Sequence, residues 1–210
     1  MLSTKIRKAA NKLLLTAGIL SLFSIAGVSR IAAQDCGAIV NSTEKRNCWV
    51  KKAEAGENNL RGADLTSVIS FVRKDFKKAD LSGANLSSSY LDGADFTDAN
   101  LSKARLERTS IRGVNFTRAN LTEANLGFSY ALRVDFTDAI LIKARLGQLK
   151  GTAAQFIRTD LTDASLTHGF FNESTFREVN FTRTNLLYAK CNFYCVVDKD
   201  KWRSLGGLIE

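Results

Sequence analysis

The chain has 210 residues, enough for one sizeable domain, and it contains no proline. Its 30 basic and 21 acidic residues give a formal charge of +9, which taken alone would favour nucleic acid or an acidic membrane as a partner. Residues 1–33 hold five of the basic residues and no acid, which leaves 25 basic and 21 acidic residues, a net +4, for the rest. This distribution weakens both possibilities.

The first segment is typical of an export signal. Basic residues precede an apolar run from Leu13 to Val28, and "SRIAAQD" follows, where Ile31 and Ala33 suit the positions before a signal-peptidase cut. We predict a cleavable signal peptide over residues 1–33 and an exported mature chain, in a periplasm or a thylakoid lumen, with secretion also open. The apolar run is shorter than the roughly 20 residues that span a bilayer, so no stable membrane anchor is expected after cleavage.

Residues 34–57 predict an N-terminal helical cap. Asn41 followed by Glu44 gives a capping-box pattern, good helix formers follow, and Gly56 marks the stop. Such a helix would cover the first coil of the segment that follows it, because an open coil exposes strand edges.

From Phe71 to Cys191 a large apolar residue returns every five positions. Of these 25 positions, all but Ala131, Gly151 and Cys191 are Leu, Ile or Phe. A period of five fits neither a helix nor a strand, and a small side chain usually lies two residues earlier, so each unit needs a corner. Phenylalanine also recurs at every fourth unit, at Phe76, Phe96, Phe116, Phe136, Phe156 and Phe176. Four units therefore form one coil of a solenoid.

The pattern is irregular at two places, and it ends before the last segment. The phase slips by one residue between Leu65 and Phe71, which predicts a distorted first coil. Ala131 and Gly151 leave little bulk on one face, and we expect Leu132 or Leu149 to compensate through a local bulge. In residues 193–210, "VVDKDKWRSLGGLIE" predicts a short helix that places Trp202 over the last coil.

The units "ADLSG", "ANLSS", "ADFTD", "ANLSK" and "ANLTE" strongly resemble the pentapeptide-repeat family. The resemblance covers about residues 58–192 and implies an all-β solenoid, a right-handed quadrilateral β-helix, here with short helical caps. The exported chain looks like the pentapeptide-repeat proteins that cyanobacteria send to the periplasm or thylakoid lumen, most of which have no assigned biochemical role.

The cysteines lie at the two ends of the repeats. An even number in an exported chain favours disulfides among Cys36, Cys48, Cys191 and Cys195. A Cys36–Cys48 bond would hold the N-terminal helix in place, but the spacing leaves open whether Cys191 bonds Cys195 or the pairs cross. No histidine lies near either pair, and we predict no metal site.

The outward columns of the coil, read at the same interval as the phenylalanines, carry charges of alternating sign. One column reads Lys78, Asp98, Arg118, Asp138, Arg158 and Glu178, and a second reads Lys103, Glu123, Lys143, Asp163 and Arg183. Opposite charges on neighbouring coils stabilise each other, so these columns are assigned to stability. Their alternation also cancels the field that a polyanion would need.

A different edge combines aromatic and basic side chains and has no acid. Its members, together called the aromatic–basic edge, are Tyr90, Arg108, Phe128, Tyr130, Lys150, His168, Phe170, Tyr188 and Lys190. Exposed rings beside cations are typical anchors of a protein interface. The alternative interpretation is structural: the rings stack on one another or lie under a terminal helix.

The sequence offers little catalytic chemistry. His168 is the only histidine and has no acid or thiol at neighbouring column positions, and most aspartates directly precede a central Leu or Phe, where they support turns. No glycine-rich phosphate loop is present, and a core filled with Leu and Phe leaves no cavity. We therefore predict no catalytic residue, no cofactor and no small-molecule substrate.

The leading hypothesis is an exported, non-enzymatic scaffold that binds a protein partner or a second copy of itself. The alternative is a DNA-mimicking gyrase-protection protein, as some members of the family are. The export signal and the lack of an acidic stripe oppose that alternative. Export also opposes nucleic-acid binding through the aromatic–basic edge.

Overall fold

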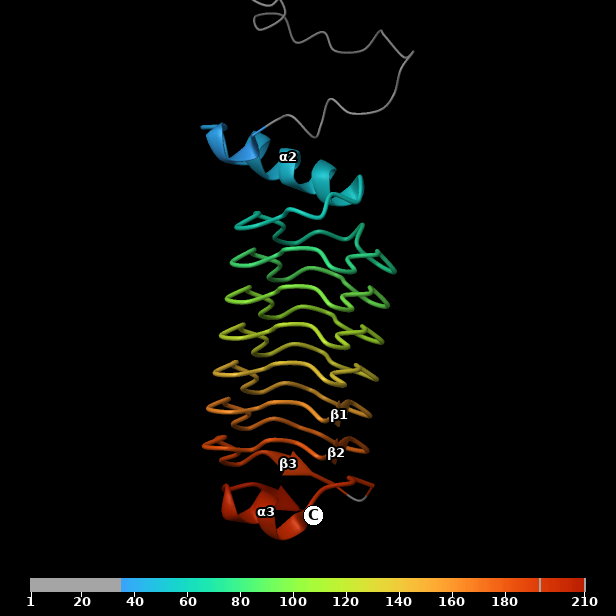
Figure 1. Cartoon of the computed structure of the whole chain (residues 1–210), viewed down its shortest axis with the longest axis vertical. Helices are drawn as coiled ribbons and strands as arrows, with labels where there is room; N and C mark the ends of the chain where they lie inside the picture. The colour runs from blue at the N-terminus through green and yellow to red at the C-terminus, as the bar shows by residue number, and fades with distance from the viewer. Residues whose placement is uncertain (1–34, 193, 210) are drawn as a thin grey trace, which may run out of the picture. The chain divides into compact units, whose positions relative to one another are not determined.

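The computed structural model describes residues 35–192 and 194–209. The predicted signal peptide lies outside the described residues. The helical elements are η1 (Cys36–Ala38), α2 (Ser42–Glu54) and α3 (Lys199–Ser204). The short strands are β1 (Gln155–Ile157), β2 (Thr175–Arg177), β3 (Lys190–Cys191) and β4 (Leu208–Ile209). Between α2 and α3 the chain winds through successive coils (Figure 1).

The coils repeat at a constant interval along most of the chain. Parallel bridges connect Asp75 with Asp95, Asp95 with Asn115 and Asn115 with Asp135, and most of the other bridges keep the same interval. Backbone amides donate from one coil to the next, for example from Phe76 to the Asp95 carbonyl oxygen at 2.7 Å. These ladders confirm the coil length predicted from the phenylalanine spacing.

The core is the column of inward side chains. The central Leu, Ile and Phe residues and the small residues two positions earlier are buried through most of the stack. The predicted phenylalanine column is present from Phe76 to Phe176, with successive ring centroids 4.6–5.3 Å apart. Stacked equivalent rings bury apolar surface and fix the register between coils.

A tight turn forms the corner of each unit. The amide of Ala79 donates to the carbonyl oxygen of Phe76 at 3.1 Å, and Lys78, the third residue of this turn, has φ 59°. A positive φ at that place is typical of a type II turn. The acidic or amide residue before the central residue supports the corner, as predicted: Asp95 Oδ1 accepts from the Thr97 amide at 2.9 Å.

The first coil is distorted, as predicted. The bridges from Asn59 to Asp80 and from Asp64 to Asn85 enclose one more residue than the bridge from Asp75 to Asp95 and those that follow it. The extra residue falls between Leu65 and Phe71 and leaves Ile69 74% exposed.

The weak face is filled without a bulge. Bridges from Tyr130 to Lys150 and from Lys150 to Phe170 keep the regular interval, so the predicted bulge is wrong. The assignment of Leu132 was also wrong, because its side chain is 40% exposed. Leu149 is fully buried and supplies the bulk that Gly151 lacks. Phe171 covers Gly151 from the next coil, where a Cβ on the glycine would lie 2.7 Å from the ring. In this unit the large side chain therefore stands at the first inward position, Leu149, instead of the second, Gly151, and no residue is inserted.

Helices close both ends of the described stack. Asn41 caps α2 by accepting from the Thr43 and Glu44 amides, and Arg46 Nε donates to the Thr66 carbonyl oxygen at 3.0 Å, which ties α2 to the first coil. At the other end Trp202 of α3 is fully buried, with its ring 4.9 Å from that of Phe176. The strand β4 then pairs in parallel with β3.

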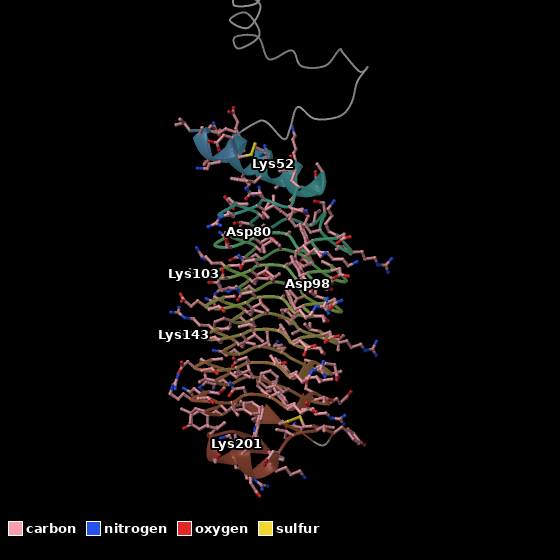
Figure 2. All side chains as sticks on the ribbon, in the orientation of Figure 1. Lys52, Asp80, Asp98, Lys103, Lys143 and Lys201 are labelled. Atoms are coloured by element: carbon pink, nitrogen blue, oxygen red, sulfur yellow. A yellow bond between two sulfur atoms is a disulfide. The ribbon has the colours of Figure 1, made fainter. Side chains whose placement is uncertain are left out.

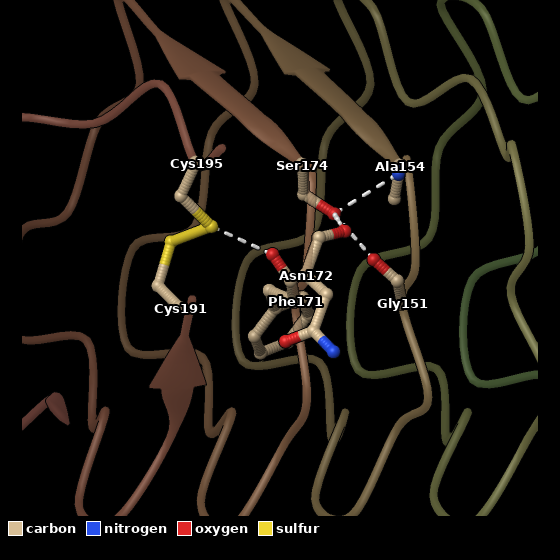
Figure 3. Close-up of a disulfide and its surroundings, with 7 residues drawn as sticks. All are labelled: Gly151, Ala154, Phe171, Asn172, Ser174, Cys191 and Cys195. Atoms are coloured by element: carbon tan, nitrogen blue, oxygen red, sulfur yellow. Dashed lines mark hydrogen bonds between the residues drawn. A yellow bond between two sulfur atoms is a disulfide. The ribbon is translucent and has the colours of Figure 1, made fainter. Parts of the chain in front are cut away.

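The two disulfides settle the open connectivity. Cys36 bonds Cys48, and Cys191 bonds Cys195. Figure 3 shows the second bond beside a buried hydroxyl, Ser174, which accepts from the Ala154 amide at 3.0 Å and donates to the Gly151 carbonyl oxygen. The first bond joins η1 to α2 within the N-terminal cap, and the second holds the chain where the coils meet the C-terminal segment.

Candidate functional site

The structure places the nine residues of the aromatic–basic edge in two neighbouring columns. The ladder column consists of successive parallel bridge partners, namely Tyr90, Ser110, Tyr130, Lys150, Phe170 and Lys190. The turn-tip column lies at the preceding corner, with φ between 56° and 62°, and consists of Arg108, Phe128, Gln148, His168 and Tyr188. Sequence spacing thus predicted these members of the two columns.

A single inward residue separates the two columns in each coil. Ser129, Leu149 and Gly169 occupy this position, and all three are buried. The residues on either side are exposed, and from Gln148 onward the two columns border a shallow groove. Near β4 the groove widens into a hollow of about 530 Å³, lined by Gln148, His168, Phe170, Tyr188, Lys190 and Leu208.

The aromatic side chains of the edge are about half exposed. The exposed fractions are 53% for Tyr90, 50% for Phe128, 45% for Tyr130, 44% for Phe170 and 53% for Tyr188. Burial under α2 or α3, which was one structural alternative, is not what holds these rings. In the ladder column Ser110 and Lys150 separate them, so the edge exposes individual rings rather than one apolar patch.

Cationic side chains lie against these rings. Lys150 Nζ is 4.7 Å from the Tyr130 ring centroid, and Arg108 Cζ is 5.8 Å from that of Phe128. Each contact connects adjacent coils and is worth about 0.5–1 kcal/mol at an exposed site. The His168 and Tyr188 ring centroids are 5.0 Å apart, the one instance among the described edge residues of the predicted ring-on-ring packing.

Acidic side chains lie beside the edge and are already hydrogen-bonded. Asp92 Oδ1 accepts from Ser110 Oγ of the ladder column at 2.5 Å and from the Arg112 amide at 3.0 Å, and Glu107 lines a hollow with Arg108 and Phe128. Glu107 accepts from Asn125 Nδ2 at 2.7 Å and from Ser87 Oγ at 2.8 Å, and it also lies 3.6 Å from Arg105 Nε. The aromatic–basic edge therefore presents hydrogen-bond donors and rings, but none of its nine members carries a carboxylate.

The alternating charges pair on other corners of the coil. Arg118 binds both carboxylate oxygens of Asp98, at 2.7 and 2.9 Å, and the same bidentate pair joins Arg158 with Asp138 and Arg183 with Asp163. The hydrogen bonds from the arginines hold the pKa of these aspartates below the usual value. The predicted pairing of opposite charges on adjacent coils is confirmed for these six residues.

The N-terminal part of the second charged column, from Lys103 to Lys143, is not closely paired. Figure 2 shows Lys103 and Lys143 on the same side of the coils. With Glu123 they line an open hollow, but no salt bridge joins these three described residues to one another. Arg105 and Arg145 border the same hollow.

The described residues contain no group of three His, Cys, Asp or Glu side chains arranged to hold a metal ion. His168 lies against a tyrosine ring rather than a carboxylate. Neither α2 nor α3, the α-helices of the described chain, has the length and apolar character needed to cross a bilayer. The arrangement is suited to binding through rings and donors rather than to acid–base chemistry.

Sequence reasoning missed one member of the ladder column. Leu208 of β4 pairs with Lys190, so the C-terminal segment adds another layer to the edge, with a side chain 42% exposed. The signal lay in "GGLIE", where two glycines precede an apolar pair, but the five-residue pattern had already ended there.

The family model for pentapeptide repeats matches residues 79–118, 119–150 and 154–186, with 8 copies of its repeat. This chain belongs to the pentapeptide-repeat family. Its membership and the similar solved structures imply a right-handed β-helix, in agreement with the regular parallel ladders.

Solved pentapeptide-repeat proteins are similar in fold. A trypsin-treated variant of QnrB1, a plasmid-mediated fluoroquinolone resistance protein, aligns with a TM-score of 0.50 and 17% identity over 71% of this chain and 84% of that one. Rfr23 from the cyanobacterium Cyanothece 51142 aligns with a TM-score of 0.44 and 22% identity over 71% and 97%. No curated protein matches the sequence. At these identities the likeness concerns the fold alone.

Proposed function

We propose that this pentapeptide-repeat protein is an exported, non-enzymatic scaffold that binds a protein partner through the aromatic–basic edge. The observation that carries the proposal is the ladder of half-exposed rings and cations held at fixed intervals. Exposed aromatics beside basic groups are common anchors of protein interfaces. Association with a second copy remains the other form of this proposal.

The proposal includes the organisation of the chain. Residues 1–33 form a signal peptide that is removed, 34–57 and 193–210 form the caps, and 58–192 form quadrilateral coils. Two disulfides support export, because such bonds form and persist in oxidising compartments such as a periplasm. A thylakoid lumen or the extracellular space meets the same requirement.

Two observations support a binding role without catalysis or nucleic acid. The inward side chains fill the coils, so the described repeats have no interior space for the concave pocket that an enzyme needs. On the surface, the bidentate aspartate–arginine pairs neutralise one another and interrupt any continuous charge. The same pairs oppose the alternative of DNA mimicry that protects gyrase, because a DNA mimic needs uninterrupted negative charge.

The test compares three baits in an extract of the exported compartment. The native chain is compared with a variant carrying Phe128→Ser, Tyr130→Ser and Phe170→Ser, and with a control carrying Ile69→Ser, Leu132→Ser and Ile140→Ser, whose side chains are also at least 40% exposed. Circular dichroism first establishes that both variants fold.

We expect a partner, or further copies of the chain, to be captured by the native and control baits and lost with the edge variant. Capture of the same set by all three baits would contradict the proposal. Inhibition of gyrase supercoiling by the native chain would instead favour the alternative function.

A further inference from the structure

The exposed rings of the ladder column recur at every second coil. Tyr90, Tyr130 and Phe170 occupy alternate coils, and the intervening coils place Ser110 and Lys150 between them. At about 4.8 Å per layer, two coils correspond to about 9.6 Å between successive rings. Gaps of one coil therefore alternate with rings along the stack.

This interval matches one conformation of a bound chain better than others. A polyproline II helix rises about 3.1 Å per residue with three residues per turn, or about 9.3 Å per turn. A β-strand repeats its side-chain pattern after about 6.7 Å, and an α-helix rises about 5.4 Å per turn, so neither keeps step with the rings. A polyproline II segment that lies along the column places an equivalent residue in every gap.

The second column supplies the opposite wall of the groove. Phe128 lies in the same coil as Tyr130, and His168 lies in the same coil as Phe170, with one buried residue between the members of each pair. The groove lies between the two columns near β4, where Gln148, His168, Phe170 and Tyr188 border it. Two aromatic walls with a narrow floor are the kind of surface on which proline-rich segments dock.

Hydrogen-bonding capacity points to the same occupant. Proline has no amide N–H, so a proline-rich segment in this conformation presents carbonyl acceptors and almost no donors. The edge presents donors in the tyrosine hydroxyls, the Gln148 amide, the His168 ring and the Lys150 ammonium, while the Asp92 carboxylate beside it already accepts from Ser110 Oγ and the Arg112 amide. The hydroxyl, amide and imidazole groups can also accept, so a glycan is the competing occupant to be tested.

We propose that the aromatic–basic edge binds a proline-rich segment of another protein in the polyproline II conformation, with two acidic residues three positions apart among the prolines. The inference rests on the proposed function, since it specifies the partner of the same surface. The present chain contains no proline, so the occupant belongs to a different protein rather than to a second copy. Arg108 and Lys150 lie in the coils between the rings of the ladder column, two coils apart, and receive the two acidic residues, which one polyproline II turn separates by about 9.3 Å.

The test measures binding of a labelled peptide to the purified full-length chain by fluorescence anisotropy. The probe has about nine residues, enough to span the three rings, all of them proline except two glutamates three positions apart near its centre. The control peptide keeps the glutamates and replaces the prolines with alternating glycine and serine. A soluble β-linked oligosaccharide serves as a competitor.

The decisive variant carries Tyr130→Lys together with Lys150→Tyr. This exchange keeps the number of rings and the charge but moves the middle ring by one coil, so that two equal intervals of two coils become one of three coils and one of a single coil. The matched control is Ile140→Ser on another column. We expect the proline peptide to bind at least tenfold more tightly than the control peptide, and the exchange to weaken it about tenfold, as expected for a displaced anchor.

Equal affinity for the two peptides, or unchanged affinity after the exchange, would overturn the inference. Displacement of the proline peptide by the oligosaccharide would identify a glycan site and also overturn it. The capture experiment asks only whether the edge binds a partner. A negative peptide experiment would therefore contradict this inference without contradicting the proposed function, whereas a negative capture experiment would contradict the proposed function itself.

Discussion

At the residue scale, the corners of the coil depend on an unusual backbone conformation. The third residue of nearly every turn has a positive φ, and most of these residues are not glycine. For a side chain other than glycine this left-handed region costs about 1–2 kcal/mol. The turn tips therefore carry side chains at a cost to stability, which the stacked core offsets.

Two neighbouring residues, Ala153 and Ala154, test this interpretation. Ala153 has φ 53°, so Ala153→Gly should raise the free energy of unfolding by about 0.5–1 kcal/mol after the greater entropy of glycine in the unfolded chain is subtracted. Ala154 is fully buried, and Ala154→Gly should lower that free energy by about 1.5 kcal/mol. Urea unfolding of both variants measures the two signs. Destabilisation by both would contradict a cost at the turn tip.

The paired aspartates predict a loss of stability in acid. Hydrogen bonds from arginine lower the pKa of Asp98, Asp138 and Asp163 in the folded chain. A carboxyl group with a depressed folded pKa stabilises the fold above its unfolded pKa of about 3.9, and this stabilisation is lost as the pH falls through the folded value. The urea concentration at the unfolding midpoint should therefore decrease when the pH is lowered below about 4.

The variant Asp138→Asn isolates one of these pairs. Its urea midpoint should decline less between about pH 5 and acid than that of the native chain, because one ionising partner of Arg158 is gone. A parallel decline of the two proteins would show that this pair contributes nothing measurable, as is common for exposed ion pairs.

At the element scale, the caps protect the ends of the ladders. The strand edge of the last coil pairs with β4, and Trp202 of α3 covers the rings of Phe171, Phe176 and Phe181. An uncovered ladder would present unpaired backbone groups and apolar rings to another molecule. The caps thus contribute to solubility as well as to stability.

Removal of the Trp202 side chain should expose this end. We expect Trp202→Ala to lower the free energy of unfolding by about 3–5 kcal/mol, the usual cost of truncating a buried aromatic ring. Light scattering after size exclusion should also show end-to-end association. Trp49→Ala in α2, where the ring is only partly buried, serves as the control and should cost less.

The two disulfides should contribute unequally. Closing the loop between Cys36 and Cys48, whose sequence separation is 12, restricts the unfolded chain by about 3 kcal/mol, whereas the separation of 4 between Cys191 and Cys195 gives about 2 kcal/mol. Replacement of each pair by serines, followed by urea unfolding, measures the difference. A larger loss from the second pair would indicate that it acts on the folded cap rather than on the unfolded chain.

The sequence predicted these elements to different extents. The cap at Asn41 and the burial of Trp202 follow from local residue types, which act at short range. The pairing of the cysteines and the addition of β4 depend on which segments meet in space, and no local pattern encodes that. Of the two residues expected to compensate for the small Ala131 and Gly151, Leu149 is buried and Leu132 is not. Composition does not reveal which inward position of a unit carries the large side chain.

At the scale of the whole described stack, the coil is the unit of construction. Each coil contacts its neighbours through the same ladders, so stability should depend on whole coils. The long repetition of one period explains why the fold was predictable from sequence. The partner of the aromatic–basic edge was not, since exposure and ring–cation contacts give the chemistry of a surface but no identity.

Two deletions test this modularity. Removal of residues 96–115, one whole coil, brings Phe116 onto Phe76 and restores the phenylalanine column, whereas removal of 96–105 places Leu106 there and shifts every later column by half a coil. We expect the shorter deletion to have the lower Tm, by about 10 °C, although its chain is longer. Thermal unfolding followed by circular dichroism measures this order. The reverse order would mean that only length matters.

The backbone ladder also fixes distances along the surface. Because main-chain hydrogen bonds set the separation of the coils, a substitution on the aromatic–basic edge changes what stands at a given height without changing the height itself. Side chains along the stack can therefore be replaced one at a time while the separation between their positions stays constant. A partner with a repeating structure of its own would bind well only if its repeat matched the separation of the coils. A shift of one coil in either molecule would remove that match.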